Sequence, residues 1–412
     1  MGKGWERTLY IMFFAQLMTA VGFSSIFPFL PLYVTELGSS TGASIELLSG
    51  LVFSAQAFTM MLMSPIWGSL ADRYGRKLMV VRSTIGGSVL LLAMAYVQSA
   101  EQLVLLRAIQ GAITGTLAAS NALVAAIAPK ERSGYAMGML TVSVGTGVAI
   151  GPLIGGAVAD LYGYGAAFFV TAAMLFLSGV LVLVGVEEKF EPDENAGGSS
   201  TGVMATWFAL LKTKGLGIAY GIRFMSQLGR MMIVPITPLF VQELMGGTEG
   251  VNTVTGLVTG VYAGMLTVSS IYLGRLGDRV GHRRVVLVSV LLVALLYLPQ
   301  SMVTQSWQLL ALLALVGAAM GGVIPTVSAL MAGYSSAGEA GMVYGLDNSV
   351  RAAARSIAPL IGSFVALWFG LRGAFVATGV IFGLTWILAA LRLPEPTTHV
   401  ETPVQEPSPR HW

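Results

Sequence analysis

The sequence predicts an all-α polytopic membrane protein, with twelve membrane-spanning helices arranged in two six-helix bundles. Hydrophobic residues make up 55% of its 412 residues and charged residues only 10%, whereas soluble globular proteins carry about 25% charged residues. Several long uncharged runs reach the roughly 20 apolar residues that one bilayer span needs. The two halves of the chain also repeat each other in sequence. This composition excludes an ordinary soluble enzyme and a disordered chain.

The uncharged runs place six spans in each half of the chain. The segment from Val285 to Gly338 carries no charge, which is enough for two spans and a tight turn. The predicted spans are 8–34, 47–67, 78–98, 102–128, 134–159, 165–186, 215–242, 252–273, 285–303, 306–334, 340–368 and 372–391. They define bundles over 1–186 and 215–391. A polar linker at 187–214 joins the bundles, and the proline-rich tail at 392–412 is expected to be disordered.

The distribution of basic residues predicts the orientation in the membrane. Lys and Arg gather in the loops after the second, fourth, sixth and eighth spans and at both termini, whereas the opposite loops contain only Arg372. Because basic residues collect on cytoplasmic loops, both termini are expected to be cytoplasmic, in a multi-pass protein of the cell (inner) membrane. The net charge of +3 then reflects topology and does not indicate a nucleic-acid partner.

The residue inventory excludes several kinds of chemistry. The chain has no cysteine, and its three histidines, His282, His399 and His411, lie in basic or tail-like sequence. Thiol catalysis, disulfides and a metal site are therefore not expected. There is no nucleotide-binding Gly-Lys-Ser/Thr loop and no Ser/His/Asp set, so we expect neither an enzyme nor an ATP-driven pump.

Three pairs of matching segments relate the two halves, each at nearly the same separation along the chain. Two six-span halves of one orientation are typical of a transporter with its site at their interface. The matching pairs are Ile26–Leu37 with Ile233–Leu244, Gly68–Lys77 with Gly274–Arg284, and Gly151–Gly155 with Ala358–Gly362.

At these motifs the chain resembles the major facilitator superfamily, and within it the twelve-span drug:proton antiporters. The segments that carry the resemblance are Gly68–Lys77, Leu106–Gly111 and Gly147–Gly156. It implies the major facilitator fold and proton-coupled efflux of drugs or other small amphipathic solutes by alternating access. The implied partners are the lipid bilayer and a small-molecule substrate. The resemblance also implies that the proton is the coupling ion, that no cofactor is needed and that the protein functions as a monomer. Export or flipping of an endogenous anionic or lipid-like metabolite is the alternative, and a non-transporting membrane sensor is disfavoured because an extra output domain is missing.

The resemblance implies a cytoplasmic latch in the loop between spans 2 and 3. Asp72 would pair with basic residues and with the N-terminal end of span 11, where a carboxylate is favourable. The alternative is ordinary positive-inside charge. The latch residues are Gly68, Asp72, Arg73, Gly75, Arg76 and Lys77, and the equivalent loop 8–9 carries Gly274, Asp278, Arg279 and Gly281.

Small residues recur at helical spacing in span 5. Small-xxx-small faces allow close helix contact, and Pro152 removes one backbone hydrogen bond. The antiporter motif, which comprises Gly147, Gly151, Pro152, Gly155 and Gly156, is expected to form a pliable, leak-tight contact between the halves, or simply to pack closely.

Charged residues within the spans are candidates for proton coupling. The resemblance implies this role for Arg107; the alternative is an arginine that reaches the outer interface. Asp347 and Arg351 are four residues apart and can pair, and Asp347 is the leading proton carrier. The arginines outnumber the carboxylates within the spans, which indicates a cavity that accepts anions. The alternative is that some of these arginines, such as Arg223, contact headgroups or backbone carbonyls. Further cavity candidates are Gln16, Phe27, Gln56, Gln110, Asn121, Gln227, Arg230, Tyr262, Asn348 and Arg355.

Overall fold

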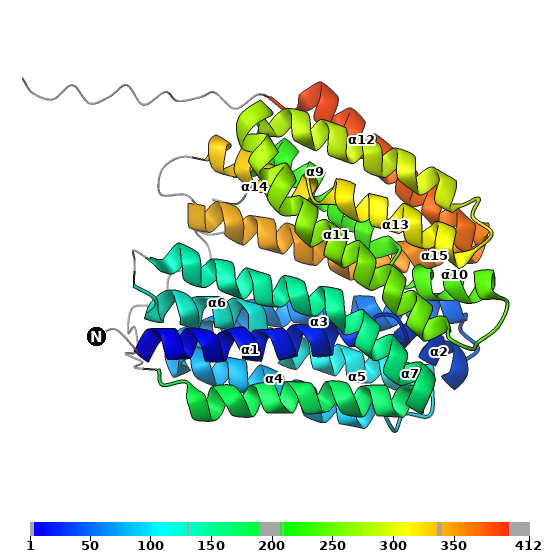
Figure 1. The fold of residues 1–412 in the computed structure, drawn as a ribbon, viewed down its shortest axis with the longest axis horizontal. Coiled ribbons are helices and arrows are strands. Elements are labelled where there is room, and N and C mark those ends of the chain that lie inside the picture. Colours follow the sequence, from blue (N-terminus) through cyan, green and yellow to red (C-terminus); the bar gives the residue numbers. More distant parts are fainter. Residues whose placement is uncertain are drawn as a thin grey trace, which may run out of the picture.

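The structure is a computed structural model, and it describes residues 4–129, 132–188, 207, 210–213, 215–335 and 340–394. The regular elements in these ranges are helices, which lie roughly parallel in two groups (Figure 1). The N-terminal half contains α1 (Gly4–Ser25), α2 (Leu30–Leu37), α3 (Ile45–Tyr74), α4 (Arg76–Met94), α5 (Ala100–Ile113), α6 (Thr116–Ile127) and α7 (Ser133–Gly185). The C-terminal half contains α9 (Leu216–Met232), α10 (Ile236–Met245), α11 (Val251–Val280), α12 (His282–Gln300), α13 (Ser306–Met320), α14 (Val323–Tyr334) and α15 (Ala340–Arg392).

The two longest helices each comprise two spans. Non-helical glycines, Gly163 with φ +83° and Gly370 with φ +73°, interrupt α7 and α15. Both parts of α7 pack on α1, since Gly147 lies against Ala20 and Ser178 bonds to Thr19, so the chain reverses between them. Nine stretches of the described residues are long and apolar enough to span a membrane. The chain reversals at Gly163 and Gly370 divide two of these nine stretches into two spans each. The pair α5 and α6 supplies a further, interrupted span, which brings the number to twelve. The predicted twelve-span, two-bundle fold is confirmed.

Four spans are broken rather than continuous, and they occupy equivalent places in the two halves. The breaks separate α1 from α2, α5 from α6, α9 from α10, and α13 from α14. Prolines mark two of them, with Pro31 in the first turn of α2 and Pro235 directly before α10. Gly115, with φ +146°, precedes α6. Interrupted spans at corresponding positions in two repeats indicate where a transporter binds its substrate.

Local sequence explains several helix boundaries. Ser44 and Ser99 cap α3 and α5 by accepting hydrogen bonds from backbone N–H groups of the first turn, which would otherwise lack partners. Gly75 and Gly281 end α3 and α11 with nearly the same backbone, at φ +95° and +96°. Only glycine adopts such dihedrals readily, so the sequence repeat at these loops is also a structural repeat.

The halves meet along a seam, by which we mean the contacts of α7 with α11 and of α3 with α15. Glycines bring the backbones together there: a Cβ on Gly256 would collide with the Pro152 carbonyl, and one on Gly50 with Ser363. These contacts lie toward the acidic end, which carries Glu36, Glu46, Glu101, Asp160, Glu243 and Glu249, and where α2 and α10 approach each other (Figure 1).

The other end of the molecule is the basic end, with Arg73, Arg76, Lys77, Arg279 and Arg283. Toward this end the seam helices are exposed, as at Pro65 on α3 and Arg275 on α11. An added Cβ at Gly68 or Gly138 would meet no atom within 4 Å. The described part of the seam is therefore tight at the acidic end and open at the basic end.

Candidate functional site

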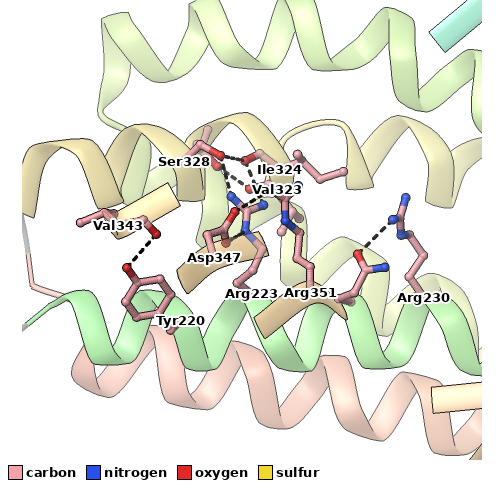
Figure 2. A network of polar contacts seen from close by, with 11 residues as sticks. Tyr220, Arg223, Arg230, Val323, Ile324, Ser328, Val343, Asp347 and Arg351 are labelled. Carbon is pink, nitrogen blue, oxygen red and sulfur yellow. Dashed lines mark hydrogen bonds and ion pairs between the residues drawn. The ribbon is translucent and has the colours of Figure 1, made fainter. Parts of the chain in front are cut away.

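A buried carboxylate, Asp347 on α15, lies between two arginines (Figure 2). Arg223 on α9 donates from Nε to Oδ1 at 2.9 Å, and a terminal nitrogen of Arg351 lies 2.9 Å from Oδ2. Asp347 is only 1% exposed. A buried charge needs partners of opposite sign because the loss of hydration is costly. The expected pair of Asp347 and Arg351 is therefore present, with Arg223 as a third member.

Arg223 also joins this network to a broken span. Its terminal nitrogens donate to Ser328 Oγ at 2.6 Å and to the Ile324 carbonyl at 3.2 Å, both on α14. With an exposure of 3%, Arg223 does not reach lipid headgroups, but the expected alternative of contact with a backbone carbonyl is present at Ile324. The network links α9, α14 and α15, which belong to spans 7, 10 and 11.

A second group of polar residues follows further along α9 and α15. Arg230 donates to Gln227 Oε1 at 2.9 Å and lies beside the Tyr262 hydroxyl. Arg355 lies close to Arg230 and Arg351, yet it is exposed, as is Asn348. The structure thus brings together four of the cavity candidates from three different helices.

Arg107 is fully buried in the N-terminal half. Its Nε donates to the Val52 carbonyl at 3.3 Å and one terminal nitrogen donates to Gln110 Oε1 at 2.7 Å. The other terminal nitrogen has no hydrogen-bond partner among the described residues. Arg107 therefore does not extend to the outer interface, and this alternative is wrong. Its role in proton coupling stays a prediction.

The remaining cavity candidates of the N-terminal half do not form one cluster. Gln16 is buried, and its Nε2 has no hydrogen-bond partner within the described part of the chain. The Phe27 ring packs on Phe53 with centroids 5.8 Å apart. Gln56 and Asn121 are partly buried on α3 and α6. Their contact with a substrate stays a prediction.

The antiporter motif packs on both of its sides. Gly147, Gly151 and Gly155 face α1, where Ser24 Oγ and Ser25 Oγ donate to the carbonyls of Gly147 and Gly151 at 3.0 and 2.9 Å. A Cβ on Gly156 would collide with the Asn252 carbonyl across the seam. Close packing and a contact between the halves are thus properties of the same motif.

The basic residues of loop 2–3 contact their own half. The backbone N–H groups of Arg76 and Lys77 donate to the Glu188 carboxylate at 3.0 and 2.8 Å, and Arg73 is exposed beside the Tyr74 ring. The Asp72 side chain and residues 336–339, which precede span 11, lie outside the described part of the structure. The latch therefore stays a prediction.

The equivalent loop 8–9 has a different local contact. His282 Nε2 lies 3.4 Å from Asp278 Oδ1, and the side chain of Asp278 is 71% exposed. Gly274 lies against Pro325, and Arg279 is exposed. The loop thus repeats the backbone of loop 2–3, with a histidine as the partner of its acid.

At the acidic end, sequence reasoning missed a contact between the halves. Asp160 on α7 accepts hydrogen bonds from Asn252 Nδ2 at 2.8 Å, Asn252 N at 3.3 Å and Thr253 N at 2.7 Å. Asn252 and Thr253 lie in the first turn of α11, so the carboxylate satisfies free N–H groups of a helix in the other half. We call this the Asp160 contact. An acid near the end of span 5 was its only sequence signal.

A carboxylate and a cavity also mark the acidic end. Glu101 accepts hydrogen bonds from Ser39, Ser40 and Thr41, and the bond from Ser39 is the main reason that the Glu101 pKa lies well below its usual value of 4.5. A cavity of about 550 Å³ opens between α2, α3 and α10, with Glu46 and Glu243 in its lining. Within the described residues no group of acidic or histidine side chains could hold a metal ion.

Comparison with known proteins places this arrangement in a family. The Major Facilitator Superfamily matches residues 12–246 and 219–412. Multidrug resistance protein MdtG of Proteus mirabilis (strain HI4320) is 35% identical over 396 residues, which cover 95% of this chain and 98% of the relative. MdtG of Serratia proteamaculans (strain 568) is 36% identical over 378 residues, or 92% and 91% of the two chains.

Solved structures share the fold. A bacterial homologue of the human lysosomal transporter Spinster, in an inward-facing and unoccupied conformation, superimposes with a TM-score of 0.77. It is 15% identical in sequence, with coverage of 95% of this chain and 98% of that one. With two repeated six-span halves, a glycine-lined seam and a family match over residues 12–412, this chain belongs to the Major Facilitator Superfamily of membrane transporters.

Proposed function

We propose that this chain exports drugs or other small amphipathic solutes across the inner membrane by proton-coupled antiport. The observation that carries the proposal is Asp347, buried between Arg223 and Arg351. It is the one fully buried carboxylate among the described residues. Arginine does not release its proton in proteins, so Asp347 is the member of this network that can carry one.

Protonation of Asp347 would change the network in a defined way. The neutral carboxyl no longer balances two guanidinium groups, so their mutual repulsion favours a rearrangement of α9 against α15. Release of the proton restores both ion pairs. Because solute and proton would alternate at neighbouring positions on these helices, the entry of one promotes the departure of the other.

The seam supports alternating access as the mechanism. If the basic end faces the cytoplasm, the tight contacts at the acidic end and the exposed helices at the basic end correspond to an inward-open state. The Asp160 contact and the glycine contacts would separate when the halves rock to open the other side. Such rigid-body motion of two repeats around a central site is the general behaviour of these folds.

The relatives' name, multidrug resistance protein, supports drug-like solutes as cargo. One observation favours a second candidate, export of an endogenous anionic metabolite: Arg230 and Arg355 form no ion pair with a carboxylate among the described residues. Both candidates use the same path and the same proton carrier.

The test uses proteoliposomes under an imposed pH gradient, with internal pH followed by a trapped dye. Phenylbutylsulfonate and phenylbutyltrimethylammonium are suitable probes because both carry permanent charges and neither moves protons alone. We expect one of them to trigger proton movement in the parent and not in Asp347→Asn. Asp347→Glu should restore part of it, and Glu249→Gln, at an exposed carboxylate, should leave it unchanged. Coupling at the parental rate in well-folded Asp347→Asn would refute the proposal.

A further inference from the structure

The arginines of the C-terminal half fall into two electrostatic groups. Arg223 and Arg351 share the carboxylate of Asp347. Arg230 and Arg355 have no carboxylate within ion-pair distance among the described residues, although the two lie close enough to interact with each other. Figure 2 shows Arg230 on α9 apart from the carboxylate of Asp347. Two neighbouring positive charges without a counter-charge repel each other, so this place favours an anion.

Two hydrogen-bond donors, one on Arg230 and one beside it on Gln227, lack an acceptor among the described residues. Gln227 is only 6% exposed. Its Oε1 accepts from Arg230, which leaves Nε2 as a buried donor without an acceptor in the described structure. The Nε of Arg230 is likewise a buried donor without an acceptor in the described structure. Buried donors nearly always have partners, so an acceptor from outside the chain is expected here.

We propose that Gln227, Arg230, Tyr262 and Arg355 bind the anionic group of the transported solute. The proposal rests on the proposed function and names the solute class as amphipathic anions with a sulfonate, phosphonate or carboxylate head. Guanidinium groups match such oxygens with paired N–H donors. The amide of Gln227 and the hydroxyl of Tyr262 add neutral donors to the same head group.

The position of this group in the fold agrees with a solute site. Arg230 lies in the last turn of α9, just before the break that separates it from α10. Arg355 is exposed and lies one helical turn after Arg351. Arg355 is thus eight residues, or about two helical turns, from the proton carrier Asp347, so the binding of solute and of proton can still influence each other electrostatically.

The test compares head groups on one hydrophobic tail. Purified full-length protein in a non-ionic detergent is heated with phenylbutylsulfonate, phenylbutanol or phenylbutyltrimethylammonium, and the midpoint of unfolding is recorded against ligand concentration. We expect the sulfonate alone to stabilise the parent. Arg355→Gln removes a charged donor at an exposed position and should weaken sulfonate binding about tenfold or more. Gln227→Glu supplies an internal carboxylate to Arg230 and should abolish sulfonate binding.

The control is Arg275→Gln, which removes an exposed arginine near the basic end and should leave sulfonate binding unchanged. Equal shifts with all three head groups, no shift with the sulfonate, or an undiminished shift in Arg355→Gln and Gln227→Glu would overturn the proposal. Failure of this site is distinguishable from failure of the proposed function. If only a cation triggers proton movement through Asp347, the proposed antiport stands and the anion site is refuted. If the sulfonate binds but no probe triggers proton movement, the anion site stands and the proposed antiport is refuted.

Discussion

The Asp160 contact makes a quantitative prediction about how firmly the acidic end is closed. Asp160→Asn keeps the shape of the side chain and removes its charge. Hydrogen bonds to charged groups contribute about 1.5–3 kcal/mol and neutral ones about 0.5–1.5 kcal/mol. The attraction between a carboxylate and a helix N-terminus adds roughly 0.3–1 kcal/mol. Because Thr253 is exposed, water screens part of this energy. We therefore expect the closed state to lose about 1.5 kcal/mol, or about tenfold in its equilibrium with the open state.

The absence of native cysteine provides the assay. Ser363 on α15 is fully buried and faces Gly50 across the other part of the seam, so Ser363→Cys reports opening without touching the Asp160 contact. A membrane-impermeant maleimide applied from the acidic side should label Ser363→Cys about tenfold faster when Asp160→Asn is also present. Glu249→Gln, at an exposed carboxylate of the same end, should leave the rate unchanged. Equal labelling rates with and without Asp160→Asn would refute the reasoning.

Three further predictions concern Arg107, Gly155 and Glu101. Arg107→Met should abolish solute-triggered proton movement in proteoliposomes while the protein still folds, because it removes a buried charge that has no ion-pair partner among the described residues. Proton movement at the parental rate would make Arg107 purely structural. Gly155→Val should lower the yield of folded protein and reduce the free energy of unfolding by at least about 1–3 kcal/mol, because the added Cβ would collide with the Ser25 carbonyl. The control is Gly68→Ala, where an added Cβ meets nothing within 4 Å. Equal thermal stability of Gly155→Val and the parent would contradict the prediction. Glu101→Gln should lower the unfolding temperature near neutral pH, because a carboxylate with a lowered pKa stabilises the fold only while it is ionised. The difference in unfolding temperature from the parent should shrink as the pH falls below the usual pKa of 4.5. A difference that does not vary with pH would contradict this prediction.

Features set by local sequence were predictable here. Uncharged length determined the spans, glycine determined the turns at Gly75 and Gly281, and four-residue spacing on one helix predicted the pair of Asp347 and Arg351. Pro31 and Pro235 lie at two of the broken spans, since proline cannot complete the helical hydrogen bonding.

Features set by packing between distant segments were not predictable. Arg223 joins Asp347 only because α9 lies beside α15, and its sequence position agreed equally well with headgroup contact. The Asp160 contact depends on how two halves dock, which no pattern within either half specifies. The breaks before α6 and α14 carried only glycine as a signal, and glycine is frequent throughout this chain, with 51 residues.

The separation of the Asp160 contact from the group around Arg230 has an evolutionary consequence for the transport cycle proposed here. A substitution at Asp160 alters the opening step that every cargo shares, so it would change export of all compounds by one common factor. A substitution at Arg230 or Arg355 alters recognition, so it would reorder the compounds without changing the shared step. A cell exposed to a single toxic compound can therefore raise its export by two independent mutational routes, and only the second narrows or redirects the range of compounds that the transporter accepts.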